Sequence, residues 1–181
     1  MVTATRTTWT FEPALLERVL QPYRSNCRYV LGASLEHPGD RRPPRPDDPQ
    51  SWVAVHGPCA IPASCYIDDT GHFNAVELNI SYNQMLYAGL AAVAERGLIA
   101  ELRHWDLEAF FRHQLPDVLI IDYHARFPRP LDPRAFRGRF EIREVIDKPH
   151  KNMVLLRTVC HVRSEPDGHA EASVVIALVH V

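Results

Sequence analysis

The sequence predicts an α+β domain in which a curved antiparallel sheet wraps around one long central helix. Three observations carry this prediction: one helix that is apolar around most of its circumference, strand-like segments before it, and four more strand-like segments after it. The chain has 181 residues, of which 46% are hydrophobic and 23% are charged, ordinary values for one globular domain with a sizeable core. We therefore expect a single domain over residues 1–181.

The first expected element is a short amphipathic helix. In FEPALLERVLQPY, the residues Leu15, Leu16, Val19 and Leu20 fall on one helical face, and Pro22 ends the helix. The segment CRYVLGASLE that follows is a strand candidate.

A proline-rich stretch interrupts this pattern between residues 37 and 50. The surrounding segment EHPGDRRPPRPDDPQ holds five prolines among alternating charges, a composition that suits neither a helix nor an inner strand. We interpret residues 37–50 as an extended, mobile loop within the domain. The segment SWVAVHGPCAIPASCYI then resumes strand character, and Pro58 and Pro62 favour an edge position or bulges.

The central helix is clearest over NQMLYAGLAAVAERG, and we expect it to include residues 84–95. Residues such as Met85, Leu86 and Leu90 leave little polar face, which predicts a helix that is buried on most sides. Gly97 suits the C-terminal stop of this helix. A second, shorter helix is expected in WDLEAFFRHQL, with Asp106 as its N-cap.

Four strand-like segments follow the second helix. They read DVLIIDYHARF, FRGRFEIREVID, NMVLLRTVCHVRS and HAEASVVIALVHV, and the turn signals PRPLDP, DKPHK and SEPDGH separate them. Connections of hairpin length make these strands antiparallel. One long helix against a large antiparallel sheet fits the hot-dog fold, with another α+β sandwich as the alternative.

Charge and motifs exclude several classes of function. A net charge of −2 gives no broad basic surface for nucleic acid. The chain has no GxGxxG loop for a nucleotide and no GxSxG elbow of a serine hydrolase. Ten histidines are many for this length, but no pair has HExxH or HxH spacing. We therefore expect no metal and no cofactor.

Cysteine usage and hydropathy predict a cytoplasmic protein. The four cysteines form no CxxC, and Cys59 and Cys65 are expected to be buried thiols in strand-like surroundings. The N-terminus has no apolar core of signal-peptide length, and the longest apolar run, ASVVIALVHV, is too short to span a bilayer. Together these features favour a compartment with reduced thiols and no membrane insertion.

A polar segment stands at the start of the apolar central helix. It reads YIDDTGHFNAVELNISYNQMLYAGL, from Tyr66 to Leu90, and its portion TGHFNAVELNISYNQMLYAGL closely resembles the FcoT-like family of acyl-thioester enzymes, which are hot-dog proteins. The similarity continues in LLERVLQPY, CRYVL, HQLPDVLI and RFPRPLDPRAF. It therefore spans most of the chain, apart from the proline-rich loop and the extreme N-terminus.

The resemblance implies a pocket at a dimer interface that accepts a fatty acyl chain and a pantetheine arm. Family members either hydrolyse long-chain acyl-CoA or add glycine to an α,β-unsaturated acyl thioester on a carrier protein, in isonitrile lipopeptide and related β-amino acid pathways. We predict glycine addition to a (2E)-enoyl thioester, with a thioesterase and a non-catalytic acyl-binding protein as alternatives. The expected partners are an acyl thioester on acyl carrier protein or CoA, glycine, and a second copy of the chain in a homodimer or larger homo-oligomer.

The resemblance also implies the residues of the site. Matched to this sequence, the side chains around the thioester are Tyr29, Tyr66, His72, Asn74 and Asn83. Amide donors and the N–H groups of a helix N-terminus would stabilise the negative charge on the thioester oxygen. His72, alone or with Glu77 from the same matched core, would take the proton of the glycine ammonium group.

Each of these residues also has a purely structural interpretation. Asn74 and Asn83 are both suited to capping a turn or helix. His72 could make a hydrogen bond inside its turn, and Tyr29 could simply pack. A plain surface carboxylate is the commoner environment for a residue such as Glu77.

Two charged residues bear on the choice of reaction. The carboxylate of glycine calls for a cation, and Arg126 in YHARFPRP is the candidate, on the strand face opposite Tyr123, Ala125 and Phe127. A surface position is the default for an arginine. Asp68 matches the DxxGHVNN pattern of 4-hydroxybenzoyl-CoA thioesterase-type proteins, which keeps hydrolysis open.

Overall fold

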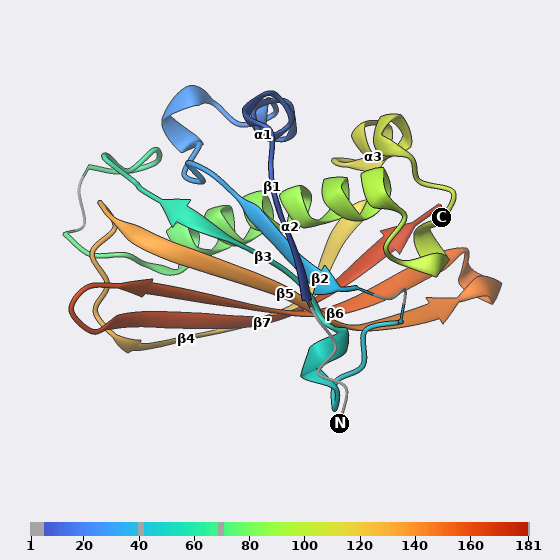
Figure 1. Ribbon diagram of the computed structural model, residues 1–181. Helices are drawn as coiled ribbons and strands as arrows, with labels where there is room; N and C mark the ends of the chain where they lie inside the picture. The colour runs from blue at the N-terminus through green and yellow to red at the C-terminus, as the bar shows by residue number, and fades with distance from the viewer. Residues whose placement is uncertain (1–5, 40–41, 69–70, 181) are drawn as a thin grey trace.

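A computed structural model describes residues 6–39, 42–68 and 71–180. A seven-stranded sheet curves beneath one long helix, α2 (Ala75–Arg96), as Figure 1 shows. Two shorter helices, α1 (Pro13–Leu20) and α3 (Leu107–His113), pack on α2 from the side away from the sheet. This arrangement is the predicted hot-dog fold.

The strands follow one another in the sheet in the order β1-β2-β3-β5-β6-β7-β4, and every neighbouring pair is antiparallel. Their bounds are β1 (Arg6–Thr10), β2 (Ser34–Pro38), β3 (Val53–Cys59), β4 (Val118–Arg129), β5 (Phe136–Lys148), β6 (Met153–Ser164) and β7 (Gly168–Val179). Short 3₁₀ helices cover Ser25–Cys27, Pro49–Ser51, Ala100–Leu102 and Pro149–Lys151.

The long helix α2 forms the centre of the core, as its apolar circumference predicts. Leu78, Leu86 and Leu90 are buried almost completely, and the helix packs against β3 and β5. Gly89 allows a close approach, because a Cβ there would lie 3.0 Å from the ring of Phe140 on β5. The prediction that the central helix includes residues 84–95 is confirmed.

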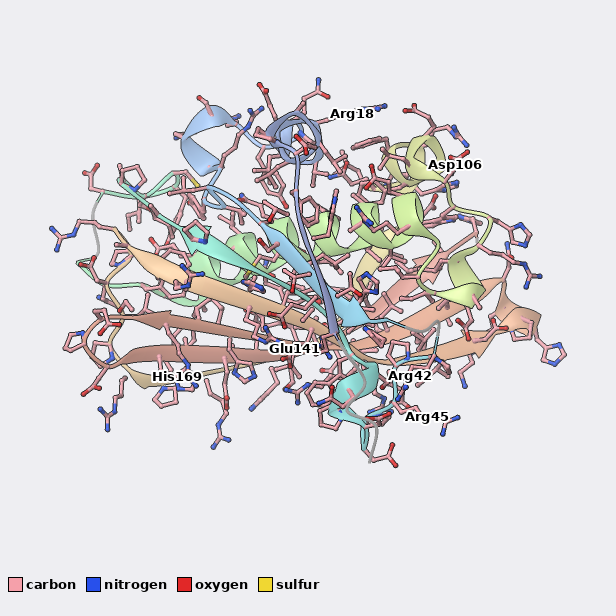
Figure 2. The ribbon with its side chains drawn as sticks, in the orientation of Figure 1. Arg18, Arg42, Arg45, Asp106, Glu141 and His169 are labelled. Carbon is pink, nitrogen blue, oxygen red and sulfur yellow. The ribbon has the colours of Figure 1, made fainter. Side chains whose placement is uncertain are left out.

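The predicted helix ends are also confirmed. Gly97 follows α2 in the left-handed conformation, with φ of 59° and ψ of 42°, which a glycine adopts without a Cβ penalty. Asp106 caps α3 by accepting a hydrogen bond from the backbone N–H of Ala109 at 2.7 Å, and it lies at the start of that helix in Figure 2. Both signals are local in sequence, so they could be read without knowledge of the tertiary fold.

The position of β4 differs from the sequence prediction. The turn signal after this strand suggested a hairpin with β5, but β4 pairs with β7 and lies at the edge of the sheet. The reason is that β5 already has β3 on one side and β6 on the other. The connection between β4 and β5 therefore crosses the end of the sheet instead of turning tightly.

The N-terminal part of the sheet was only partly predicted. The strand β1 was not expected, and β2 begins later than the predicted strand and continues into the proline-rich segment as far as Pro38. The other end of that segment is also structured, because Trp52 Nε1 donates to the carbonyl oxygen of Arg45 at 2.7 Å. Residues 40–41 lie outside the described part, and mobility of the 37–50 loop stays a prediction.

The hydropathy and cysteine predictions have separate outcomes. In the described ranges, no helix is both long enough and apolar enough to cross a membrane. Cys59 is a buried thiol on β3, as expected. Cys65 is only half-buried and lies in the loop after β3, so its predicted strand-like burial is wrong.

Candidate functional site

A groove of about 610 Å³ opens at the N-terminal end of α2. One wall is the loop between β3 and α2, which contributes residues 61–64, Asp68 and His72. The opposite wall is the connection between β4 and β5, residues 130–134, and Glu77 from the first turn of α2 also lines the groove. Two loops that are distant in sequence thus meet at the start of the buried helix.

Asn74 is the N-cap of α2 and forms a reciprocal capping box with Glu77. Asn74 Oδ1 accepts hydrogen bonds from the backbone N–H groups of Val76 at 2.9 Å and Glu77 at 3.4 Å, and Glu77 Oε2 accepts from the N–H of Asn74 at 3.0 Å. The capping interpretation of Asn74 is therefore confirmed. Two amide donors of the helix terminus are already occupied, so a thioester oxygen needs other donors.

The side-chain amide of Asn74 also holds Tyr66. Because Oδ1 accepts from two backbone N–H groups, the other amide atom is the nitrogen, and Asn74 Nδ2 donates to the Tyr66 hydroxyl oxygen at 2.6 Å. The Tyr66 O–H proton is then directed away from Asn74. Tyr66 is 45% exposed and precedes Ile67 and Asp68 of the groove wall. It presents a hydroxyl donor beside the groove.

His72 and Glu77 line the same groove in different environments. The side chain of His72 is exposed, whereas Glu77 is only 2% exposed. The alternative interpretation of Glu77 as a plain surface carboxylate is wrong, because the capping box draws this side chain back against the start of α2. A buried carboxylate and an accessible imidazole share one cavity, which suits proton transfer.

Tyr29 packs in the core and is absent from the groove wall. It is fully buried, its hydroxyl donates to Cys65 Sγ at 3.1 Å, and burial raises the pKa of Tyr29 far above its ordinary value. Gln84 of α2 fixes this segment, since its Oε1 accepts from the backbone N–H groups of Tyr29 at 2.8 Å and Val30 at 3.1 Å. The packing interpretation of Tyr29 is therefore supported, and Gln84 is a supporting residue that sequence reasoning missed.

Asn83 lies in the third turn of α2, away from the helix cap. It is half-buried, and Asn79, one turn earlier, shares its face of the helix. Asn79 Oδ1 is buried and has no hydrogen-bond partner within the described residues. The hydroxyl oxygen of Tyr123 on β4 is also buried and has no hydrogen-bond partner among the described residues. The ring of Tyr123 lies 6.3 Å from that of Tyr82.

In the described part of the chain, Asn79 and Tyr123 thus carry buried polar atoms without partners, outside the lining of the groove. Buried polar groups normally have hydrogen-bond partners, so each exception calls for an explanation. Asn79 was missed by sequence reasoning, although the spacing NISYN places two asparagines four residues apart in an otherwise apolar helix.

Within this chain, Arg126 does not join the groove. It is exposed on β4 and lies opposite Glu171 of β7, on the sheet face that is turned away from α2. Arg134, in the crossing connection between β4 and β5, lines the groove instead and pairs with Asp132 at 3.1 Å. Sequence reasoning missed Arg134, although it stands within the family-like segment RFPRPLDPRAF.

The fold and this groove define the class of the protein as a thioesterase-like hot-dog enzyme. Comparison with solved structures agrees on the fold: a protein of Shewanella oneidensis superposes with a TM-score of 0.50, at 13% identity, over 93% of this chain and 99% of that chain. The family model described as the FcoT-like thioesterase domain matches residues 18–178. The chain belongs to this family.

Two curated relatives are similar to this chain over most of its length. A protein of Streptomyces coeruleorubidus named (2E)-enoyl-[ACP] glycyltransferase is 42% identical over 74% of this chain and 74% of its own length. A protein of Mycobacterium marinum with the same name is 35% identical over 92% of this chain and 86% of its own length.

Proposed function

We propose that the protein adds glycine to the β-carbon of a (2E)-enoyl thioester carried on an acyl carrier protein. The relatives named (2E)-enoyl-[ACP] glycyltransferase, at 42% and 35% identity, support this substrate class. The observation that carries the proposal is a groove in which an imidazole, a buried carboxylate and a guanidinium lie beside an oriented tyrosine hydroxyl. The predicted cytoplasmic location is part of the proposal, since it keeps the four free cysteines reduced.

Tyr66 is suited to the thioester carbonyl. When the glycine nitrogen attacks the β-carbon, the electrons of the carbon–carbon double bond move toward the carbonyl, whose oxygen becomes negative as an enolate. The Tyr66 O–H would donate to that oxygen, because its own oxygen already accepts from Asn74. One donor of this kind typically contributes a few kcal/mol to transition-state stabilisation, about 3 in measured cases. Protonation of the α-carbon then restores the thioester.

His72, Glu77 and Arg134 are suited to glycine. The amine attacks only after its ammonium group loses a proton, and His72, supported by Glu77, would accept it and later return it to the α-carbon. Arg134 would bind the carboxylate of glycine, since its side chain is 79% exposed and pairs with Asp132 at the groove. No atom is lost in this reaction, and the product is an N-carboxymethyl-3-amino acyl thioester.

The reaction is tested by intact-mass measurement of a (2E)-enoyl carrier-protein thioester incubated with the purified protein, with and without glycine. A glycine-dependent gain of one intact amino acid supports the proposal. Release of free acid at the same rate in both samples, without adduct, identifies a thioesterase, a reaction for which Asp68 in the groove could activate water. Tight acyl binding without either product identifies a non-catalytic acyl-binding protein.

The groups are assigned by matched variants. His72→Ala should slow adduct formation by about 10²-fold or more while the acyl thioester still binds. His104→Ala, an exposed histidine beside α3, should retain the full rate. Arg134→Gln should raise KM for glycine, whereas Arg126→Gln should leave it unchanged; the reverse outcome would transfer the carboxylate role to Arg126.

We also propose that the protein is a homodimer joined through β4. This strand is at the edge of the sheet in Figure 1, and it exposes Leu119, Ile120, Ile121 and Phe127. A long apolar edge strand pairs readily with another strand. Light scattering should give the mass of a dimer at micromolar concentration, and Ile121→Lys should shift it toward the monomer. A wild-type monomer at that concentration would refute this interface.

A further inference from the structure

Two histidines and a glutamate gather on the sheet face that is turned away from α2. His161 of β6 lies opposite Glu171 of β7, and His169 precedes Glu171 by two residues, so all three share one face. Figure 2 shows His169 on the side of the sheet away from the helices. The intervening and adjacent residues point into the core and are buried, namely Cys160, Val162, Ala170 and Ala172.

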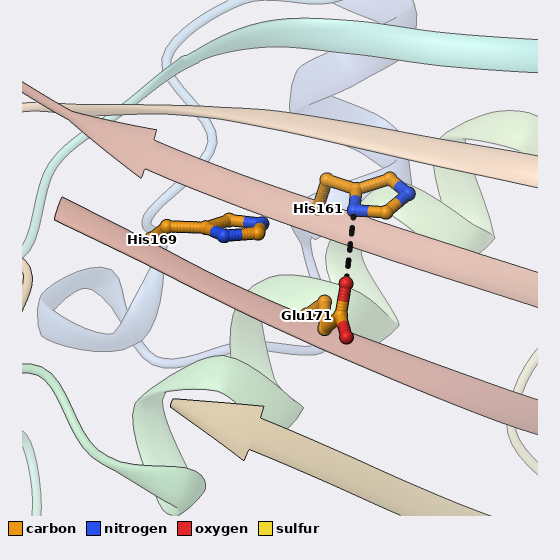
Figure 3. A group of neighbouring side chains, drawn as sticks. All are labelled: His161, His169 and Glu171. Atoms are coloured by element: carbon orange, nitrogen blue, oxygen red, sulfur yellow. Dashed lines mark ion pairs between the residues drawn. The ribbon is translucent and has the colours of Figure 1, made fainter. Parts of the chain in front are cut away.

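The three side chains converge on one point. Figure 3 shows the ring of His169 extending toward the pair formed by His161 and Glu171. His161 Nδ1 lies 3.7 Å from Glu171 Oε2, and one ligand atom from each of the three residues lies within 4.8 Å of the others. All three residues are half-buried, so bulk water has limited access to the point at which their ligand atoms meet.

One of these groups lacks a partner in the described part of the chain. His169 Nε2 is buried and makes no hydrogen bond within residues 6–39, 42–68 and 71–180. The two imidazole rings lie 6.2 Å apart with an interplanar angle of 22°. A buried imidazole nitrogen without a partner, aimed at a second imidazole and a carboxylate, is a donor set for a metal ion.

We propose that His161, His169 and Glu171 bind a divalent transition-metal ion, with Zn²⁺ the best match. Ligands at about 2.0–2.2 Å from tetrahedral zinc lie about 3.4 Å from one another, close to the separation of His161 and Glu171. Small side-chain rotations would close the wider separation. His161 and His169 also line a groove of about 1020 Å³, which leaves the fourth coordination position open to a water molecule or anionic ligand.

The charges around the cluster affect how tightly it can bind a metal cation. Arg139 is hydrogen-bonded to Glu36 at 3.1 Å and to Glu141 at 2.8 Å, so its charge is matched. On β4, Arg126 lies opposite Glu171 and Arg129 lies opposite His169. On β6, Arg163 lies opposite His169 and lines the same groove. The positive charge of Arg163 opposes cation binding, and removing this charge should tighten metal binding.

The proposed site departs from the prediction of no metal, which rested on spacing within single segments. The sequence order is His161, then His169 eight residues later, then Glu171, a pattern outside the familiar motifs. The antiparallel register of β6 and β7 brings the three together. The cluster lies on the sheet face opposite α2 and shares no lining residue with the groove of His72, so it is separate from the proposed glycine site.

The test is calorimetric titration of the metal-free protein with Zn²⁺, followed by titration with Co²⁺ monitored by visible absorption. One equivalent should bind, and Co²⁺ should give the absorption of a four-coordinate nitrogen–oxygen site. Loss of a residue that only hydrogen-bonds to a metal ligand typically weakens metal binding about 10- to 100-fold. Replacing a ligand itself, as in His161→Ala, His169→Ala and Glu171→Gln, should therefore weaken Zn²⁺ binding by at least about 10-fold.

Control variants separate this site from another histidine of the same groove and test the charge beside it. His56→Ala, in the same groove but outside the cluster, should bind as the wild type does. Arg163→Gln should bind Zn²⁺ more tightly. Circular dichroism and thermal melting of the metal-free variants establish that each is folded. Absence of stoichiometric binding by the wild type, equal affinity in the three ligand variants and the wild type, or weaker binding by Arg163→Gln would overturn the proposal.

Discussion

Replacement of Asn74 separates the stability of the helix from the proposed chemistry. In the wild type, Oδ1 caps α2 and Nδ2 donates to the hydroxyl oxygen of Tyr66. Asn74→Asp keeps an oxygen for the cap but replaces the amide donor with a second acceptor. The Tyr66 O–H would then donate to the introduced carboxylate and no longer to the substrate.

The two functions of Asn74 predict different magnitudes. Asn74→Ala removes the cap and should cost about 1 kcal/mol, which lowers the melting temperature of a chain of this size by about 2–4 °C. Asn74→Asp should be more stable than the alanine variant, since its carboxylate caps the helix and interacts favourably with the helix dipole. Its turnover should nevertheless fall by about 10²–10³-fold, the typical effect of losing one oxyanion donor.

The assay pairs thermal melting with the glycine-dependent mass shift for the wild type and both variants. Tyr66→Phe is the matched control, because it removes the hydroxyl and leaves the cap of α2 intact. It should match Asn74→Asp in turnover and the wild type in helix capping. Wild-type turnover in Asn74→Asp would refute the role of the Tyr66 proton, and a lower melting temperature than that of Asn74→Ala would refute the cap assignment.

Two further predictions concern the fold. A Cβ at Gly57 would lie 1.9 Å from the backbone oxygen of Gly32, so Gly57→Ala should cost at least about 3 kcal/mol. Gly32→Ala, whose nearest contact would be 3.8 Å away, should change the unfolding free energy by less than about 0.5 kcal/mol; equal losses in chemical denaturation would contradict this interpretation. Burial raises the pKa of Glu141, but hydrogen bonds from Arg139 and Arg143 lower it overall below its ordinary value of 4.5. The ionised Glu141 side chain therefore stabilises the folded state fully above pH 4.5, and this stabilisation is lost as the pH falls through the lowered pKa. Glu141→Gln should reduce the free energy of unfolding by about 1.5 kcal/mol near neutrality and by much less in acid. A difference between the two proteins that does not change with pH would disprove this prediction.

Much of the fold followed from local signals in the sequence. The extent of α2, its stop at Gly97 and the cap of α3 at Asp106 depend on residues within a few positions of one another. The place of β4 did not, because strand order depends on which edges are still open once β3, β5 and β6 have paired. The periodicity of a strand in the sequence does not indicate which strand it pairs with.

The site divides in the same way. His72, Asn74 and Glu77 lie close together in the chain and do meet at the groove. Arg134 was missed because its position depends on the crossing connection between β4 and β5, and Arg126 was preferred because it lies on a recognisable strand. Asn74 was weighed as either a helix cap or a donor to the thioester carbonyl, and its Oδ1 caps α2 whereas its Nδ2 donates to the Tyr66 hydroxyl.

The placement of β4 beside β7 has a consequence for the order in which the molecule assembles. Ala125 pairs with Ala172, so β4 emerges from the ribosome well before its partner exists. Until then its apolar residues have no neighbouring strand, and the nascent chain exposes an apolar segment that is prone to aggregation. Closing this long loop late should make docking of β4 a slow event in folding.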